Sequence, residues 1–340
     1  MLDSPQSQEK IINSQLRTKK EIFHLVTLII LASFIWLWIF FSIFRQFVPE
    51  STDHTTTCYI KDVISNKLTK THEKYVLPIG ERCVRWEDLS KKEQEELSDT
   101  SGGFELFGGI TTPVFLLFFA LFGLFLHYLS IAFIRINAIK AGPNQFPEIW
   151  EVSKNLSFRL GMKKQPDIFI LPGGGFLNAF AAKLVLRKII VIYFELADAL
   201  TEDKNQSQLE AIVGHELGHH ALGHTNIFLE WFLTPVEYIP FLSLPLSRAR
   251  EYSSDRAMFS LIPNLSICER ALIKLITGKR LGNKVNTEAY LKQAYEEKGF
   301  FTWLAEKMST HPHLPYRIMA LQKFAEKNKL LASQGLTLQG

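Results

Sequence analysis

Two long runs without a charged residue constrain this chain more than any other feature. The first, Leu25 to Phe44, has 20 residues, about the number that a helix needs to cross a ~30 Å hydrocarbon layer. The second, Leu106 to Ile134, is long enough to span with tilt. A buried core helix usually carries a polar stripe, which argues against that alternative for both runs. We therefore expect two transmembrane helices, over residues 25–44 and 104–134.

The basic residues beside these runs predict the orientation of the chain. Arg17, Lys19 and Lys20 precede the first run, and Arg135 and Lys140 follow the second. Residues 45–103 carry more acidic than basic side chains, whereas residues 135–340 carry an excess of basic ones. Because basic flanks stay in the cytoplasm, we expect residues 1–24 and 135–340 to be cytoplasmic and residues 45–103 to form an extracytoplasmic loop.

Composition excludes several other classes of protein. With 47% hydrophobic residues the chain is not disordered, and a net charge of +4 does not indicate a nucleic-acid binder. Three cysteines cannot form a disulfide scaffold. Cys58 and Cys83 both lie in the expected outer loop, where a disulfide persists if it forms, so a bridge between them is a hypothesis.

Residues 135–340 are numerous enough for one globular domain, and their pattern predicts an α+β fold. The runs Ile168 to Leu171 and Lys188 to Phe194 are typical of strands, and Pro147 to Leu160 of an amphipathic helix. From about Ser247 onward the pattern is helical, with breaks expected near Gly282, at Pro312 and at Pro315.

A helix with two histidines carries the strongest chemical signal. Ser207 to Glu210 matches a capping box and predicts the start of this helix. His215 and His219 are four residues apart, so both imidazoles lie on one face and can hold one Zn²⁺. Glu216 lies between them in sequence and can reach a metal-bound water.

A catalytic zinc needs a third protein ligand and one open position. The metzincin spacing is absent, because Leu222 and Thr225 stand where that pattern has Gly and His. His220 and His224 are interpreted as surface histidines. Downstream, Glu251 and Asp255 are four residues apart and share a helix face. One of these carboxylates can ligate the metal while the other hydrogen-bonds a ligand histidine.

Two further stretches complete an ordered set of motifs: Leu177 to Ala181, which contains Asn178, Ala179 and Phe180, and His311-Pro312 followed by Arg317. The set resembles the gluzincin-type membrane metallopeptidases that include HtpX and the CAAX prenyl endopeptidases, over residues 149–321. The resemblance implies a mostly helical zincin domain whose small sheet bears the substrate edge strand. The loop at 45–103 departs from typical HtpX-like chains, so no role is carried over to it.

The same resemblance implies a role for each matched residue. His215, His219 and Glu251 are expected to ligate one Zn²⁺, with Glu216 as general base and Asp255 behind the ligands. His311 and Arg317 are expected near the cleft, where either can hydrogen-bond the oxyanion; alternatively, Arg317 only pairs with a carboxylate. Asn178 and Ala179 are expected to contact substrate, although a turn-capping role for Asn178 is an equal alternative.

Residues 227–246 form a third apolar stretch, where HtpX-like chains carry two further spans. The histidine pair and Glu251 must meet on one side of the membrane, so this stretch crosses an even number of times. Two crossings need ~40 residues, and the stretch has three prolines and two glutamates. We expect no crossing, and instead an interfacial or re-entrant hairpin or a flap over the cleft.

The predicted activity is zinc-dependent hydrolysis of peptide bonds in membrane or misfolded proteins, with the substrate extended against the strand at 188–194. The expected partners are polypeptide substrates and the lipid bilayer, and the expected location is the bacterial inner membrane. A non-proteolytic zinc-containing client-binding protein and a prenyl-peptide endopeptidase are the alternatives.

Overall fold

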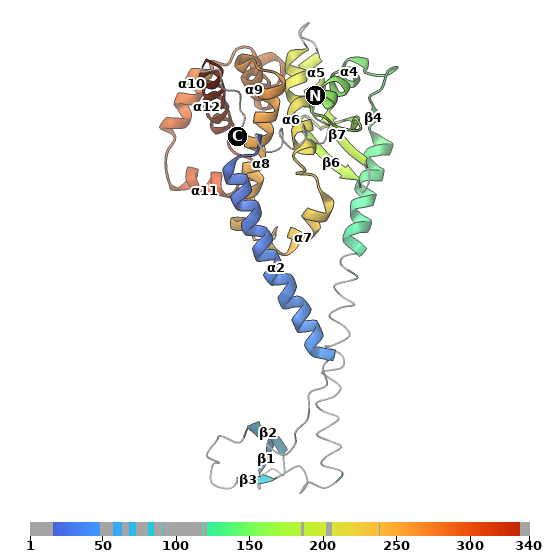
Figure 1. Ribbon diagram of the computed structural model, residues 1–340, viewed down its shortest axis with the longest axis vertical. Coiled ribbons are helices and arrows are strands. Elements are labelled where there is room, and N and C mark those ends of the chain that lie inside the picture. Colours follow the sequence, from blue (N-terminus) through green and yellow to red (C-terminus); the bar gives the residue numbers. More distant parts are fainter. Residues whose placement is uncertain are drawn as a thin grey trace, which may run out of the picture. The chain divides into compact units, whose positions relative to one another are not determined.

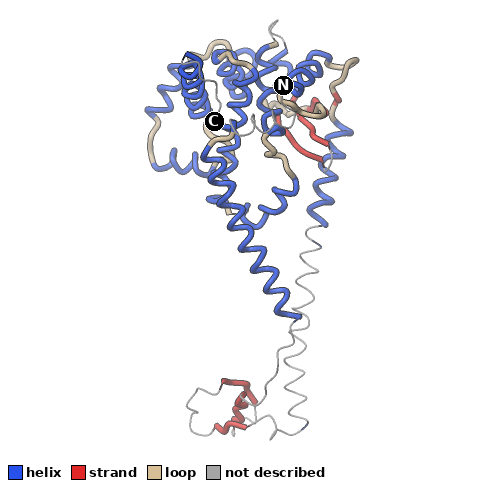
Figure 2. The backbone as a smooth tube through the Cα atoms, viewed as in Figure 1, coloured by secondary structure: helices blue, strands red, loops and turns tan. Residues whose placement is uncertain are grey.

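The computed structural model describes residues 16–47, 57–62, 68–72, 81–84, 91, 118, 121–184, 187–201, 206–237 and 239–333 (Figure 1). The chain divides into two compact units: Met1–Ile35 together with Leu126–Gly340, and Trp36–Phe125. The first unit holds the domain predicted to be catalytic. Tracing the backbone by secondary structure shows that this domain is mostly helical with one small sheet (Figure 2).

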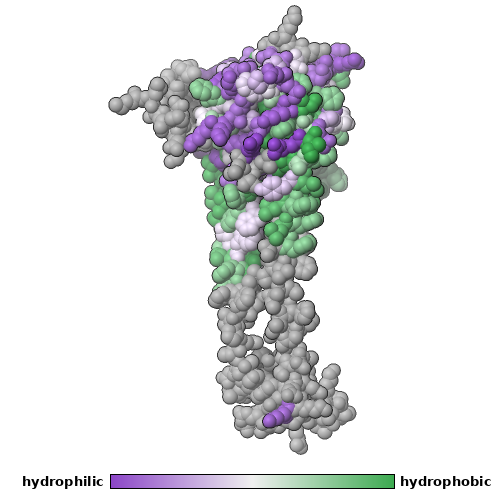
Figure 3. Space-filling model, turned by 90° about the vertical axis from the view of Figure 1, so that its right-hand side faces the viewer, coloured by the Kyte–Doolittle hydropathy of each residue, from purple (hydrophilic) through white to green (hydrophobic). Residues whose placement is uncertain are grey.

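One described helix is long and apolar enough to cross a membrane. It is α2 (Lys19–Phe47), whose apolar segment is Lys19–Phe41; in the most apolar 18-residue stretch only 11% of the residues are buried. The second predicted span begins outside the described residues; its described part is the shorter apolar helix Leu121–Asn137, which continues beyond the expected end at residue 134. Leu126, Leu129 and Phe133 of this helix are exposed hydrophobic side chains. A hydrophobic zone adjoins the hydrophilic surface on the face drawn in Figure 3.

The smaller unit contains a three-stranded antiparallel sheet within the segment that was expected to be a loop. Strands β1 (Thr57–Asp62), β2 (Leu68–His72) and β3 (Glu81–Val84) are ordered β2-β1-β3. Cys58 is on β1, and Cys83 is on β3, where it pairs with Ile60 of β1. The side chains of both cysteines lie outside the described part, so the disulfide stays a prediction.

The larger unit is built on a mixed four-stranded sheet with the order β4-β5-β7-β6. Its strands are β4 (Ile139–Lys140), β5 (Asp167–Leu171), β6 (Ala179–Leu184) and β7 (Arg187–Tyr193). β7 runs parallel to β5 and antiparallel to β6, so both of its edges are paired. The prediction that substrate adds to the strand at 188–194 is therefore wrong, and β6 is the edge strand.

The four central residues of β7, Ile189 to Ile192, are apolar and buried because both faces of the sheet are covered there. Ile190 and Ile192 face the main core, which the helices complete. Ile189 and Val191 belong to a second cluster, against which Ile134 packs from the end of the second apolar helix. The helix predicted to span the membrane therefore ends in contact with the sheet.

Nine helices follow β4 in the described part of the domain. They are α4 (Pro147–Arg159), α5 (Phe194–Thr201), α6 (Ser207–Ala221), α7 (Ile227–Glu237), α8 (Pro240–Leu261), α9 (Leu265–Gly282), α10 (Thr287–Glu296), α11 (Phe300–Met308) and α12 (Leu314–Ser333). Of these, α5 and α6 make the main contacts with the sheet. α6 is central because it packs against α4, α8, α9 and β6 (Figure 1). The predicted breaks near Gly282 and Pro312 are present, but Pro315 lies inside the first turn of α12, where proline is tolerated.

The third apolar stretch is a helical hairpin. α7 ends at Glu237 and α8 begins at Pro240, which is in the first turn of α8. Phe228, Trp231 and Phe241 of this hairpin are more than half exposed. The hairpin shape was expected; its relation to a membrane stays a prediction.

Candidate metal centre

His215 and His219 lie on α6, which starts at Ser207 as predicted. The expected capping box is not formed. Gln206 occupies the N-cap position and makes no side-chain capping bond. The helix is instead held by packing, since most of its residues are buried against its neighbours.

A glycine between the histidines lets α6 and α8 approach closely. A Cβ at Gly218 would lie 2.8 Å from the Cβ of Ala257 and 3.3 Å from the Cα of Ser254, both on α8. Real side chains do not pack at the first distance, so only glycine permits this helix separation. The close approach brings Glu251 of α8 to the histidine pair.

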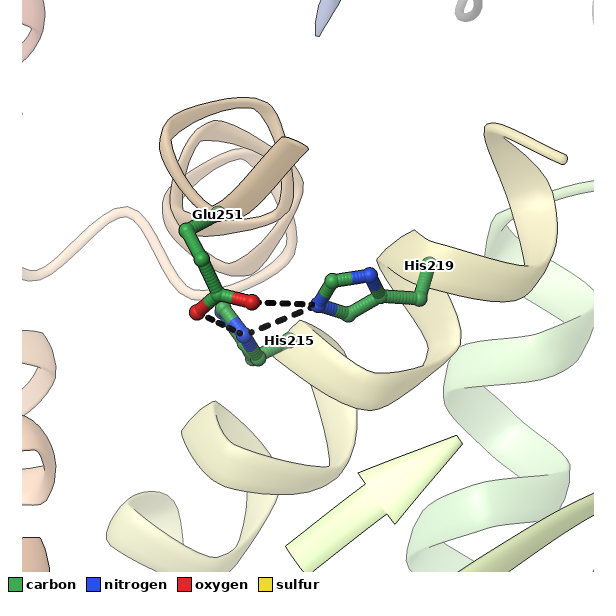
Figure 4. Close-up of side chains that lie close together, drawn as sticks. All are labelled: His215, His219 and Glu251. Atoms are coloured by element: carbon green, nitrogen blue, oxygen red, sulfur yellow. Dashed lines mark hydrogen bonds and ion pairs between the residues drawn. The ribbon is translucent and has the colours of Figure 1, made fainter. Parts of the chain in front are cut away.

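His215, His219 and Glu251 converge on one point (Figure 4). The two Nε2 atoms are 3.2 Å apart, Nε2 of His215 is 3.5 Å from Oε2 of Glu251, and Nε2 of His219 is 3.3 Å from Oε1. Ligand atoms ~2.0–2.1 Å from a tetrahedral zinc lie about 3.3 Å from one another. The donor set and its spacing therefore fit a single zinc ion.

A carboxylate and a guanidinium lie behind these residues. Oδ1 of Asp255 is 2.9 Å from Nδ1 of His215, so His215 donates there and keeps its Nε2 lone pair for the metal. Arg317, from α12, donates to both oxygens of Asp255, at 2.6 and 2.9 Å, and its NH1 is 3.1 Å from Oε2 of Glu251. All three of these charged side chains are buried.

The electrostatics of the cluster favour positive charge at its centre. Burial raises the pKa of Glu251, but the charge of Arg317 and hydrogen bonds with the two histidines outweigh it and hold this pKa well below its ordinary value. Burial likewise opposes the ionised form of Asp255, and Arg317 again lowers the pKa. Burial lowers the pKa of His215, yet its bonds to Asp255 and Glu251 raise it to about 10. A site that favours a proton this strongly also suits a divalent cation.

A pocket of about 220 Å³ opens over the three converging residues. Glu216 lines it and is buried, which raises the pKa of its carboxyl group. His311 lines it too; its side chain is 65% exposed, and Nε2 is 3.7 Å from Oε1 of Glu251. The remaining wall comes from the edge strand and from α9, and the lining includes Asn178, Ala179, Phe180, Ala181, Leu272 and Leu275.

Asn178 and Ala179 stand where β6 begins, at the rim of the pocket. Oδ1 of Asn178 accepts a hydrogen bond from the N–H of Ala179, and the carbonyl oxygen of Asn178 accepts one from the N–H of Tyr193. The preceding glycine loop is fixed by Glu195, whose carboxylate accepts from the N–H groups of Gly173 and Gly175. These backbone donors lower the pKa of Glu195.

His220 and His224 are buried, so the prediction that they lie on the surface is wrong. Nε2 of His220 meets the carbonyl oxygen of Ile189 at 2.9 Å, which ties α6 to β7. His224 lies beyond the end of α6, where the turn at Gly223 (φ 73°) folds it back to within 3.1 Å of His219. Burial lowers the pKa of both histidines to about 3, so both rings are neutral.

Sequence reasoning missed one further residue at this centre. Glu21, at the start of α2, is fully buried, and its Oε1 is 3.1 Å from Nε2 of His224. No local signal identifies it, because the two residues are 203 positions apart. The turn that brings His224 back was signalled only by Gly223.

Comparison with known proteins places this geometry in a family. The model of peptidase family M48 matches residues 143–236 and 226–325, which together make up more than half of the chain. The chain belongs to peptidase family M48. No curated protein matches it. A solved structure with similarity is that of S. mikatae Ste24p, at 18% identity and a TM-score of 0.35, covering 66% of each chain, just under two thirds.

Membership of this family confirms the resemblance inferred from the ordered motifs. M48 proteins are zinc-dependent metallopeptidases. The described residues supply one cluster with the donor atoms that zinc requires, and one helix suited to a membrane. The role of each residue and the substrate belong to the proposal that follows.

Proposed function

We propose that this protein is a membrane-anchored zinc endopeptidase that hydrolyses peptide bonds of membrane or misfolded polypeptides. The observation that carries the proposal is the convergence of His215, His219 and Glu251 at zinc-ligand spacing, with Glu216 on the wall of the same pocket. These three side chains would hold one zinc ion, and the pocket beside them would admit water and substrate to it. When bound, zinc activates the attacking water and polarises the scissile carbonyl.

The other residues of the site bind, orient and move protons. Glu216 takes the proton of the attacking water and passes it to the leaving amine; its raised pKa suits this exchange near neutral pH. His311 is exposed to the pocket and hydrogen-bonds the oxyanion. Arg317 is engaged by Asp255 and Glu251 and holds these carboxylates rather than the substrate.

The edge strand offers a path for an extended substrate. β6 pairs with β7 on one side only, and its residues Ala179, Phe180 and Ala181 line the pocket. A polypeptide that adds to this edge gains backbone hydrogen bonds while its scissile bond approaches the metal. Asn178, whose Oδ1 already accepts from Ala179, orients the start of this edge.

The chain is proposed to reside in a bacterial inner membrane, with residues 25–44 and 104–134 as spans. Residues 1–24 and 135–340 lie in the cytoplasm and residues 45–103 outside it. The support is the flanking basic residues, together with the apolar and exposed surface of α2. The hairpin at 227–246 contacts the bilayer surface through its exposed aromatic side chains.

The Glu216→Gln variant tests the assignment of the base. Full-length protein in detergent is expected to keep one zinc per chain and to lose cleavage of an unfolded polypeptide such as casein by at least 100-fold, about the size of a general-base contribution. Zinc is measured by metal analysis and cleavage by peptide release. If the variant cleaved casein at the wild-type rate, Glu216 would not be the base; a wild type that binds zinc without cleaving would favour the client-binding alternative.

Specificity is tested with two substrates of different chemistry. We expect turnover of a destabilised membrane protein to exceed that of a prenylated peptide with a C-terminal CAAX sequence. Both reactions are followed by mass spectrometry of the products, with Glu216→Gln as the background control. Preferential cleavage of the prenylated peptide would assign this chain to the prenyl-peptide endopeptidases instead.

A further inference from the structure

A segment that precedes the first apolar run is built into the back of the metal centre. Leu16 is buried in a cluster with Leu222 and Ala257. The Arg17 guanidinium donates to the carbonyl oxygen of Leu222, and the N–H of Thr18 donates to Oγ of Ser253 at 3.0 Å. These contacts join the segment to the end of α6 and to the helix that carries Glu251.

The segment ends in a carboxylate that is buried beside a histidine. Glu21 has no exposed surface; Oε1 is 2.6 Å from NH1 of Arg17 and 3.1 Å from Nε2 of His224. Its own N–H donates to Oγ1 of Thr18, which fixes the first turn of α2. Burying a carboxylate costs free energy. The ion pair with Arg17 offsets part of that cost but does not explain the contact with His224.

The hydrogen-bond pattern assigns a proton position to each ring. An ionised carboxylate only accepts, so the single proton of the His224 ring is on Nε2, which faces Glu21 at 3.1 Å. Its Nδ1 is then an acceptor and lies 3.1 Å from Nδ1 of His219. His219 must donate from Nδ1, which leaves the lone pair of its Nε2 at the point where the three metal-ligating atoms converge.

We infer that Glu21 is a positioning residue for the zinc ion: it acts through His224 to hold His219 in the tautomer and orientation that ligate the metal. The inference rests on the proposed function, since it takes His219 as a ligand. It parallels the pairing of Asp255 with His215, so each ligand histidine has a carboxylate behind it, directly in one case and through a second imidazole in the other.

The test measures zinc affinity of the full-length protein by competition with a chromogenic chelator. Glu21→Ala removes the acceptor for His224, and His224→Phe removes both hydrogen bonds of the relay. Each is expected to weaken zinc binding by 10- to 100-fold, as loss of such outer partners generally does. The double variant is expected to bind zinc as tightly as the single variant with the lower zinc affinity, because both substitutions interrupt the same relay.

A matched control separates positioning from anchoring. Arg17→Met removes the ion pair with Glu21 and the bond to Leu222 but leaves the contact between Glu21 and His224. Its zinc affinity is expected to stay within threefold of wild type. If Arg17→Met lowered zinc affinity as much as Glu21→Ala, the segment would act only as an anchor and the inference would be overturned.

A rescue guards against variants that fold poorly. In Glu21→Ala, a second change His224→Asn supplies an amide oxygen that accepts from Nδ1 of His219 without help from Glu21. We expect it to recover at least half of the lost affinity, measured on a logarithmic scale, and the wild-type visible spectrum of the Co²⁺-substituted protein. Absence of rescue, or wild-type affinity in Glu21→Ala, would overturn the inference while leaving the proposed activity intact. A wild type without stoichiometric zinc would overturn both.

Discussion

Asp255 is the buried carboxylate that pairs with both Arg317 and His215. It accepts two hydrogen bonds from Arg317 and one from His215, and none of these three side chains is more than slightly exposed. Removing Asp255 would leave the buried charge of Arg317 without its partner. The free-energy cost of that unpaired charge exceeds what the ion pair itself contributes to stability. The same residue therefore affects both metal binding and stability.

For Asp255→Ala we expect zinc affinity to fall by 10- to 100-fold and the free energy of unfolding to fall by about 3–5 kcal/mol. Chelator competition and urea unfolding measure the two effects. Asp198→Ala is the matched control, because Asp198 pairs with Lys279 on the surface, and such pairs contribute less than about 1 kcal/mol. Equal losses in the two variants would contradict the role given to Asp255.

Proton release on zinc binding follows from the raised pKa of His215. A histidine must be neutral to ligate a metal. In the metal-free protein the pKa of His215 is raised to about 10, so its ring is protonated at neutral pH. Zinc binding is therefore expected to release one proton from His215 at pH 7 to 8.5, and zinc affinity to rise with pH by up to tenfold per unit. Titration calorimetry in buffers of different ionisation enthalpy checks this. An affinity independent of pH over that range would show that His215 is neutral before the metal binds.

At the scale of elements, the site depends on how closely α6 and α8 approach. The histidine pair is on α6 and Glu251 is on α8, so the distance between these side chains is set by the distance between the two helices. Gly218 sets it, because any side chain there meets Ala257. Interior packing does not yield by several tenths of an ångström without cost.

Gly218→Ala is expected to destabilise the protein by about 1–3 kcal/mol and to weaken zinc binding, because Glu251 moves away from the histidines. Thermal unfolding and chelator competition provide the measurements. A second change, Ala257→Gly, is expected to recover part of both losses. Gly142→Ala is the control, since a Cβ there meets no atom within 4 Å. Unchanged zinc affinity in Gly218→Ala would show that α8 accommodates the extra methyl group.

At the scale of the whole molecule, the metal centre restricts the membrane topology. On the proposed function, α6 and α8 hold one metal ion together, so we expect the α7–α8 hairpin between them to begin and end on the same side of a bilayer. α7, and the part of α8 that precedes Glu251, are each shorter than the ~20 residues that a membrane-spanning helix needs. Its exposed aromatic residues fit contact with the membrane surface instead.

Cysteine labelling tests this topology. With the native cysteines replaced, Asn226→Cys and Ser247→Cys are expected to react with an impermeant maleimide only from the side of the catalytic domain. A cysteine introduced in residues 45–103 is expected to react only from the opposite side. Labelling of the two hairpin positions from opposite sides would contradict both the hairpin and the shared metal centre.

Local patterns sufficed for much of this protein. The histidine pair, the carboxylate pair, the helix at 147–160 and the start of the helix at Ser207 follow from spacing along one chain segment, since a helix places residues four apart on one face whatever surrounds it. The apolar runs are equally local, because a membrane span requires only length and an absence of charge. The identity of the edge strand is different: β7 is the more hydrophobic strand because both of its edges and both faces are covered, and hydrophobicity alone cannot distinguish that from an exposed edge.

The amino-acid sequence by itself determined the chemical groups that a zinc peptidase requires. They are a histidine pair and a carboxylate pair, each with its members four residues apart on one helix. Only the tertiary structure decided how they meet: Gly218 sets the helix separation, Arg317 arrives from α12, and Glu21 reaches His219 through His224. Those contacts join residues up to about 200 positions apart. Their energies come from burial and from hydrogen bonds that exist only after the chain has folded.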